Sequence, residues 1–186
     1  MSQVSIFDVL NDVVTPSQVV PAMSSVPAVK APGLTADEAR SRFIREFSQT
    51  ARYHHRWDVF RDFITLVAGE LDIARIRTPE NIAASRKICD RYQAADLERF
   101  HVLFSLLISA LQGKYHDFLG SVFMELELGS GDMGQFFTPY PMARLLAQLL
   151  LDDTLQQLKT CPWVTLNEPT SGAGGMVIAF AESIAG

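Results

Sequence analysis

Two short segments, GQFFTP at 134–139 and NEPTSGAGG at 167–175, enclose the stretch of sequence that decides the fold. Between them runs one helical pattern with an apolar face. Its apolar members are Met142, Leu145, Leu146, Leu149 and Leu150. Residues 162–167, which are rich in β-branched and aromatic side chains and bounded by prolines, predict a strand. A helix is expected after the glycines, from Met176 to about Ile184, so the order is strand, glycine-rich turn and helix.

Glycines in such a turn let the backbone approach a ligand closely, because they tolerate positive φ and carry no side chain. The pattern Gly-x-Gly-Gly at 172–175 is not the spaced fingerprint of dinucleotide-binding proteins. No Lys-Ser or Lys-Thr pair follows it, as a phosphate-binding loop requires. A nucleoside triphosphate site is therefore not expected here.

Residues 36–112 predict an all-helical bundle without strands. Thr35 and Glu38 fit a capping box at the start of the first helix, and Thr78 with Pro79 marks the start of another. A helix from about His55 shows apolar residues at spacings of three and four. These residues are Trp57, Phe60, Ile64, Val67 and Leu71. A longer and more apolar helix is expected over 95–112, buried on most sides.

Composition is typical of a globular protein, with 48% apolar and 20% charged residues among 186. The net charge of −5 gives no support for tight nucleic-acid binding, although local patches decide such contacts. The densest group of positive charges in the sequence, here called the basic cluster, consists of Arg75, Arg77, Arg86, Lys87 and Arg91. They either follow a phosphate backbone or form a solvated helix face.

Cys89 and Cys161 lie far apart and without metal-ligand spacing, so no metal site is predicted. The chain starts without a leader peptide, and we expect a reducing, cytoplasmic location. The apolar run 103–111 is too short to span a bilayer, so no membrane contact is expected.

Residues 1–33 carry four prolines and little charge, and we expect a disordered arm. The alternative is a docking peptide in which Ile6, Phe7 and Leu10 anchor in a groove of a partner. The expected domains are thus the arm 1–33, a helical domain 34–112 and a third region 113–186.

The two segments that enclose residues 134–175 together resemble the cofactor motifs of adenine-N6 DNA methyltransferases of the gamma class. QFFTP at 135–139, followed by a leucine-rich helix, is similar to the first motif. EPTSGAGG at 168–175 is similar to the second, usually Asp-Pro-x-Cys/Ser-Gly-Ser/Ala-Gly-Gly. The helix that begins with DFLGSVF at 117–123 also looks like the one before the first motif in modification subunits of type I restriction–modification systems. The resemblance is strong over 117–180, suggestive over 36–112 and absent over 1–33.

This resemblance implies an S-adenosylmethionine site. Residues 136–139 would contact the methionine and adenosine portions, and Glu168 and the turn 171–175 would hold the amino-acid end. The implied cofactor-binding residues are Phe136, Phe137, Thr138, Pro139, Glu168, Pro169, Ser171, Gly172, Gly174 and Gly175. The implied fold is mainly α, with a helical N-terminal region before the first strand and flanking helices of an incomplete α/β methyltransferase domain.

Two departures from the family pattern limit the expected activity. Glu168 stands where aspartate is usual, which keeps the charge but shifts it outward. The Asp/Asn-Pro-Pro-Tyr/Phe loop, which holds the flipped adenine in this family, is missing from the 186 residues, so no catalytic residue is assigned. We therefore expect an N-terminal fragment of a DNA methyltransferase that does not methylate DNA alone and whose longer form acts with DNA and with a specificity or restriction subunit.

Two alternatives remain open. One is a catalytically inactive methyltransferase-like protein that contacts a partner or DNA in restriction control or antirestriction, which the Glu168 substitution favours. The other is an autonomous helical interaction module over residues 36–130.

Overall fold

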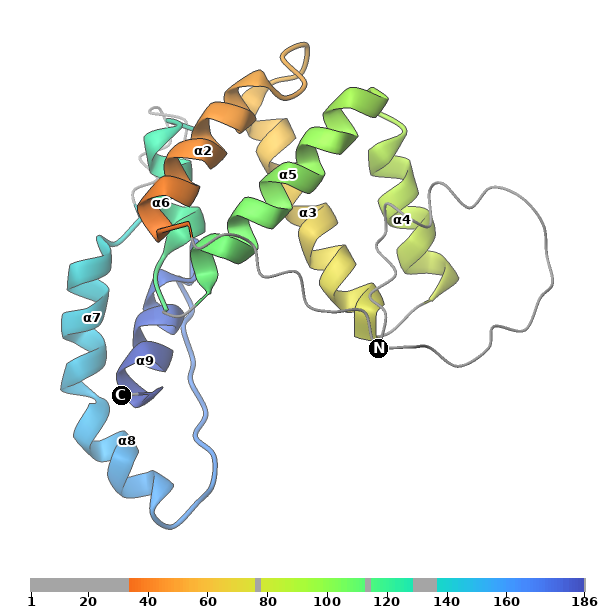
Figure 1. Ribbon diagram of the computed structural model, residues 1–186. Helices are drawn as coiled ribbons and strands as arrows, with labels where there is room; N and C mark the ends of the chain where they lie inside the picture. Colours follow the sequence, from red (N-terminus) through yellow and green to blue (C-terminus); the bar gives the residue numbers. More distant parts are fainter. Residues whose placement is uncertain (1–33, 76–77, 113–114, 129–136, 186) are drawn as a thin grey trace. The chain divides into compact units, whose positions relative to one another are not determined.

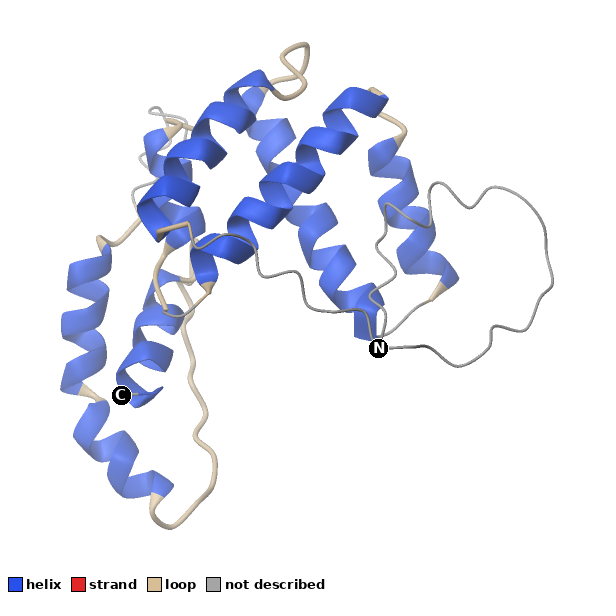
Figure 2. Ribbon diagram, in the orientation of Figure 1, coloured by secondary structure: helices blue, strands red, loops and turns tan. Residues whose placement is uncertain are grey.

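The computed structural model describes residues 34–75, 78–112, 115–128 and 137–185. Helices, turns and loops make up this described part, and no strand occurs in it (Figure 2). The chain is therefore mainly helical, as predicted from sequence. Two compact units are formed, Arg45–Ser105 and Leu34–Ile44 with Leu106–Gly186 (Figure 1). The predicted boundaries at residues 33 and 112 stay predictions.

The first unit is built on α3 (Arg56–Arg75) and α4 (Pro79–Cys89). It also contains the C-terminal part of α2 (Ala36–Gln49) and most of α5 (Ala94–Leu111). Aromatic and branched side chains that are almost fully buried form its core. They are Phe47, Val59, Phe63, Leu66, Phe100 and Leu103. The rings of Phe63 and Phe100 lie 5.8 Å apart, and burial of such rings contributes much of the stability of a small unit.

The predicted inner face of α3 is wrong in part. Phe60 of the predicted pattern is buried, whereas Trp57 and Leu71 are exposed. The rest of the buried face consists of Val59, Phe63 and Leu66, which the predicted pattern did not include. Apolar residues occur on more than one side of α3, and packing against α5 through Phe63 and Phe100 selects one side.

Polar side chains complete the connection between α2 and α3. Arg56 donates to the carbonyl oxygens of Phe47, Thr50 and Ala51 at 3.0, 2.8 and 2.6 Å, which satisfies carbonyls that the end of α2 leaves unpaired. Ala51 has a φ of 42°, and its amide donates to Asp96 at 2.8 Å. A buried carboxylate of α5 therefore fixes this turn.

Both predicted helix starts are confirmed. The Thr35 amide donates to the Glu38 carboxylate at 2.9 Å, and the Glu38 amide donates back to the Thr35 hydroxyl at 3.3 Å. Thr78 accepts from the Asn81 amide at 3.2 Å, and Pro79 opens α4. Such caps involve residues three apart, so the sequence is enough to predict them.

The second unit contains α6 (Phe118–Glu125), α7 (Tyr140–Leu149), α8 (Leu151–Leu158) and α9 (Gly175–Ala185). Helices α7 and α9 lie side by side (Figure 1) and meet through the small residues Ala143, Ala147 and Ala179. Beside this contact, Glu182 accepts from the Tyr140 hydroxyl at 2.9 Å and pairs with Arg144 at 3.2 Å. Alanines allow the two helices to approach closely, and the polar groups set their register.

The strand predicted over residues 162–167 is not formed, and this stretch has no regular secondary structure. A strand is stable only when its amides and carbonyls pair with a neighbouring strand, and the described chain supplies none. The α/β methyltransferase domain therefore stays a proposal.

Helix α7 buries its alanines and exposes its large residues. We call the five apolar residues predicted from its spacing the α7 stripe. Their exposed fractions are 52% for Met142, 52% for Leu145, 40% for Leu146, 72% for Leu149 and 53% for Leu150. Since α9 packs on the alanine face, the larger apolar face has no cover among the described residues.

None of the helices in the described ranges is long and apolar enough to cross a membrane.

Candidate functional site

The ring of Phe137 packs against Gly172, and this contact joins the two sequence segments. A Cβ atom placed on Gly172 would lie 3.1 Å from Cδ1 and 3.3 Å from Cε1 of Phe137. Gly172 has a φ of +50°, which disfavours a residue with a side chain. Glycine is thus favoured at position 172 for two reasons: its backbone conformation is left-handed, and the Phe137 ring occupies the space that a side chain would need.

Phe137 is also held from α6. The rings of Phe123 and Phe137 lie 5.1 Å apart at an angle of 53°. Such tilted contacts between aromatic rings are favourable beyond the apolar area that they bury. The Phe137 ring therefore contacts both α6 and the glycine-rich turn.

The other residues of the first segment lie at the start of α7 or beyond the described part. Thr138 and Pro139 are exposed, and the Pro139 carbonyl accepts from the amides of Met142 and Ala143 at 2.9 and 3.1 Å. Phe136 lies outside the described residues. The structure thus places Phe137, Thr138 and Pro139 together as the entry to α7.

Gly174 of the glycine-rich turn borders open space. Gly174 has a φ of +83°, and a Cβ atom on it would meet nothing within 4 Å. Its amide donates to the Ser171 carbonyl at 2.6 Å, which closes the turn directly before α9. Pro169, Ser171 and Gly172 are exposed. Since α9 begins at Gly175, the turn leads into the positive end of a helix, which favours anions.

Glu168 is held by its own loop. Its Oε1 accepts from the amide and the hydroxyl of Thr170 at 2.9 and 2.6 Å. Both hydrogen bonds lower the pKa of Glu168 below its ordinary value, and the bond from the Thr170 hydroxyl has the larger effect. The carboxylate is therefore charged near neutral pH and has one oxygen engaged within the turn.

Asp117 is a residue of the site that sequence reasoning missed. Its Oδ1 accepts from the Gly120 amide at 2.9 Å as the cap of α6, and a Cβ atom on Gly175 would lie 3.3 Å from its Oδ2. Burial raises the pKa of this carboxyl above its ordinary value. The sequence places Asp117 before a helix, but its approach to the first residue of α9 is a tertiary contact without a local signal.

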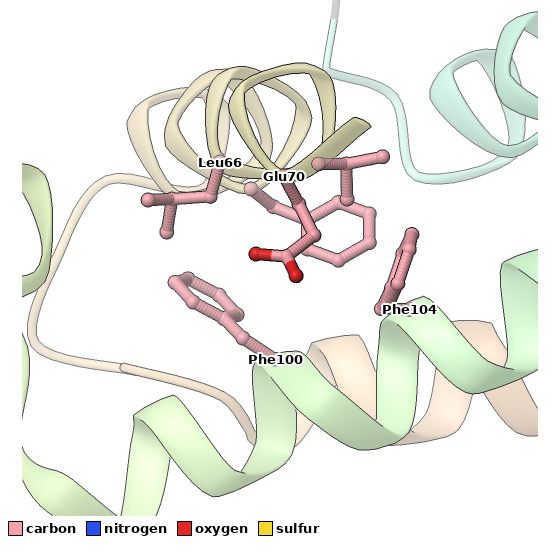
Figure 3. A pocket seen from close by; sticks show the side chains of 6 residues that line it. Leu66, Glu70, Phe100 and Phe104 are labelled. Atoms are coloured by element: carbon pink, nitrogen blue, oxygen red, sulfur yellow. The ribbon is translucent and has the colours of Figure 1, made fainter. Parts of the chain in front are cut away.

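A small cavity lies within the first unit, and none of the predicted cofactor-binding residues lines it (Figure 3). Its volume is about 10 Å³, which is the space of one water and far too small for a cofactor. It is lined by Phe63, Leu66, Val67, Glu70, Phe100 and Phe104. The Glu70 carboxylate points between the rings of Phe100 and Phe104. We regard this cavity as a packing feature.

The basic cluster is only partly assembled. Arg86 and Lys87 line a shallow depression on α4 together with Asp90, whereas Arg91 pairs with the buried Asp62 at 3.0 Å. The side chains of Arg75 and Arg77 lie outside the described part of the chain. Arg91 therefore has a role within the fold, and the described positive surface is smaller than the sequence suggested.

No protein-family model matches this chain, and neither a curated protein nor a solved structure matches it.

Proposed function

We propose that residues 117–185 form the donor-binding part of a DNA adenine-N6 methyltransferase that uses S-adenosylmethionine. The packing of Phe137 on Gly172 is the observation that carries this proposal. Two motifs that are separate in sequence both have to border the donor, and this contact brings an aromatic ring and a bare backbone turn together. An unrelated loop and glycine-rich turn would not require this contact between the two motifs.

Each group at the turn has a chemical counterpart in the donor. The glycine-rich turn and the first amides of α9 offer positive ends of peptide dipoles, which suit the carboxylate of the methionine portion. The charged Glu168 suits its ammonium group, although Thr170 already occupies Oε1. The ring of Phe137 offers an apolar face to the adenosine portion.

The chain by itself is expected to bind the donor without transferring the methyl group. Transfer requires the amino nitrogen of adenine to lie in line with the bond between the methyl carbon and the sulfonium sulfur of the donor. The polar and aromatic residues that hold a flipped base in this family are missing from these 186 residues. Contact with DNA and with a specificity or restriction subunit is proposed for a form that carries those residues.

Calorimetric titration of the 186-residue chain with S-adenosylmethionine tests the proposal. We expect binding that weakens at least tenfold in Phe137→Ala, since the loss of one well-placed aromatic contact is worth about 1.4 kcal/mol or more. Phe104→Ala in the first unit is the matched control, because Phe104 is also half-buried but lies in the other unit. ATP serves as a control ligand, because the turn lacks phosphate-loop chemistry. Equal affinity in wild type and Phe137→Ala contradicts the proposal.

A second candidate is a methyltransferase-like protein that binds DNA or a partner without catalysis. The engagement of Glu168 by Thr170 favours it, because the carboxylate has less capacity left for the donor. Fluorescence anisotropy with a labelled duplex distinguishes the two functions. DNA binding that weakens with salt, together with no binding of the donor, supports the second candidate.

A further inference from the structure

The α7 stripe is an exposed apolar surface on an otherwise ordinary helix. Met142, Leu145, Leu146 and Leu149 recur at positions i, i+3, i+4 and i+7, so they share one face of α7. Leu150 follows at i+8 as the C-terminal cap of the helix. Leu149 is the most exposed of them, at 72%. Scattered apolar residues on a surface need no explanation, but a contiguous stripe of this kind marks an interaction site.

The charged residues near the stripe indicate what kind of molecule could bind to it. Arg144 is the one basic residue of α7, and it is paired with Glu182 of α9. The next helix begins with the exposed Asp152 and Asp153. Anionic lipid surfaces and nucleic acids both require a row of Lys or Arg beside the apolar face. The partner is therefore another apolar protein surface.

The exposed area agrees with the requirement of a symmetric dimer. The five side chains leave on the order of 500 Å² uncovered, so two stripes in contact bury about 1,000 Å², which is the lower limit for a specific interface. In a twofold arrangement the same stripe serves both partners, and an uncharged apolar stripe is complementary to itself.

From these observations we propose that the α7 stripe is the contact surface between two copies of this chain, which associate as a homodimer in solution. The small area and the absence of charge pairs across the contact predict an affinity in the micromolar range, about 1 to 100 μM. The contact is independent of the proposed donor site, because Phe137 and Gly172 are not part of the stripe.

Sedimentation equilibrium over a concentration range of about 1 to 200 μM tests this proposal. We expect the average mass to rise from 20.6 kDa toward twice that value as concentration increases. In the double variant Leu145→Asp/Leu149→Asp the dimer constant should weaken at least 100-fold, because two charges would be buried on each side. Both residues are exposed in the monomer, so the variant should keep its helical circular dichroism.

The matched control is Leu71→Asp/Tyr115→Asp, which adds the same charge at exposed positions that are not part of the stripe. It should dimerise like the wild type. A wild-type chain that stays at 20.6 kDa throughout the concentration range overturns the proposal. Equal dimer constants in the two double variants also overturn it, as does association into larger species that the stripe variant does not abolish.

Discussion

Replacement of Gly172 by alanine is expected to destabilise the second unit through two separable effects. The left-handed backbone at φ +50° costs a residue with a side chain roughly 1–2 kcal/mol. The new methyl group would also lie 3.1 Å from the Phe137 ring, and displacement of a packed ring costs about 1 kcal/mol. The free energy of unfolding should therefore fall by roughly 2–3 kcal/mol.

A double-mutant cycle isolates the contact with the ring. In a Phe137→Ala background the steric part disappears, so the two substitutions together should destabilise less than the sum of their single effects, by about 1 kcal/mol. Gly174→Ala is the matched control, because Gly174 also has positive φ (+83°) but its Cβ position is empty. The cycle of Gly174 with Phe137 should be additive within about 0.5 kcal/mol.

Urea unfolding followed by tryptophan fluorescence measures these energies. The chain has two tryptophans, and a Trp57→Phe background leaves only Trp163, which lies in the second unit. Additive effects of Gly172→Ala and Phe137→Ala would refute the packing of the ring on the turn. The structural basis of the proposed donor site would then be lost as well.

Three further outcomes follow from buried polar groups and thiols. Tyr92→Phe should lower the free energy of unfolding by about 1–3 kcal/mol in urea denaturation, because the Tyr92 hydroxyl donates to the buried Asp62 at 2.6 Å. Burial raises the pKa of Cys89 to about 11, so in the native chain at pH 8 a thiol reagent should modify Cys161 quickly and Cys89 only after unfolding, as mass spectrometry can show. Burial also raises the pKa of Asp117, so stability is lost as pH rises through that pKa, and the stability of Asp117→Asn relative to wild type should increase from about pH 3 to pH 6 in urea titrations.

Each of these outcomes has a control. Tyr115→Phe removes an exposed hydroxyl and should leave the free energy of unfolding unchanged within about 0.5 kcal/mol. Asp152→Asn, at an exposed position, should not reproduce the pH trend of Asp117→Asn. Rapid modification of Cys89 in the native chain would show that the first unit opens far more readily than its burial implies.

The sequence by itself determined most helices and their starts. The capping pairs Thr35 with Glu38 and Thr78 with Asn81 are interactions over three residues, and helical spacing of apolar residues repeats over one or two turns. The positive φ angles of Gly172 and Gly174 also follow local chemistry. Such features depend on neighbours along the chain, and the sequence contains all of those neighbours.

Only the tertiary structure decided which faces are buried and which segments meet. Helix α7 packs through Ala143 and Ala147 and exposes its larger residues, because α9 presents Ala179 to it. Residues 162–167 stay irregular, because strand pairing needs a second segment at the right distance. The approach of Phe137 to Gly172 depends on where α6, α7 and α9 lie in space, and spacing along one helix carries no information about such distances.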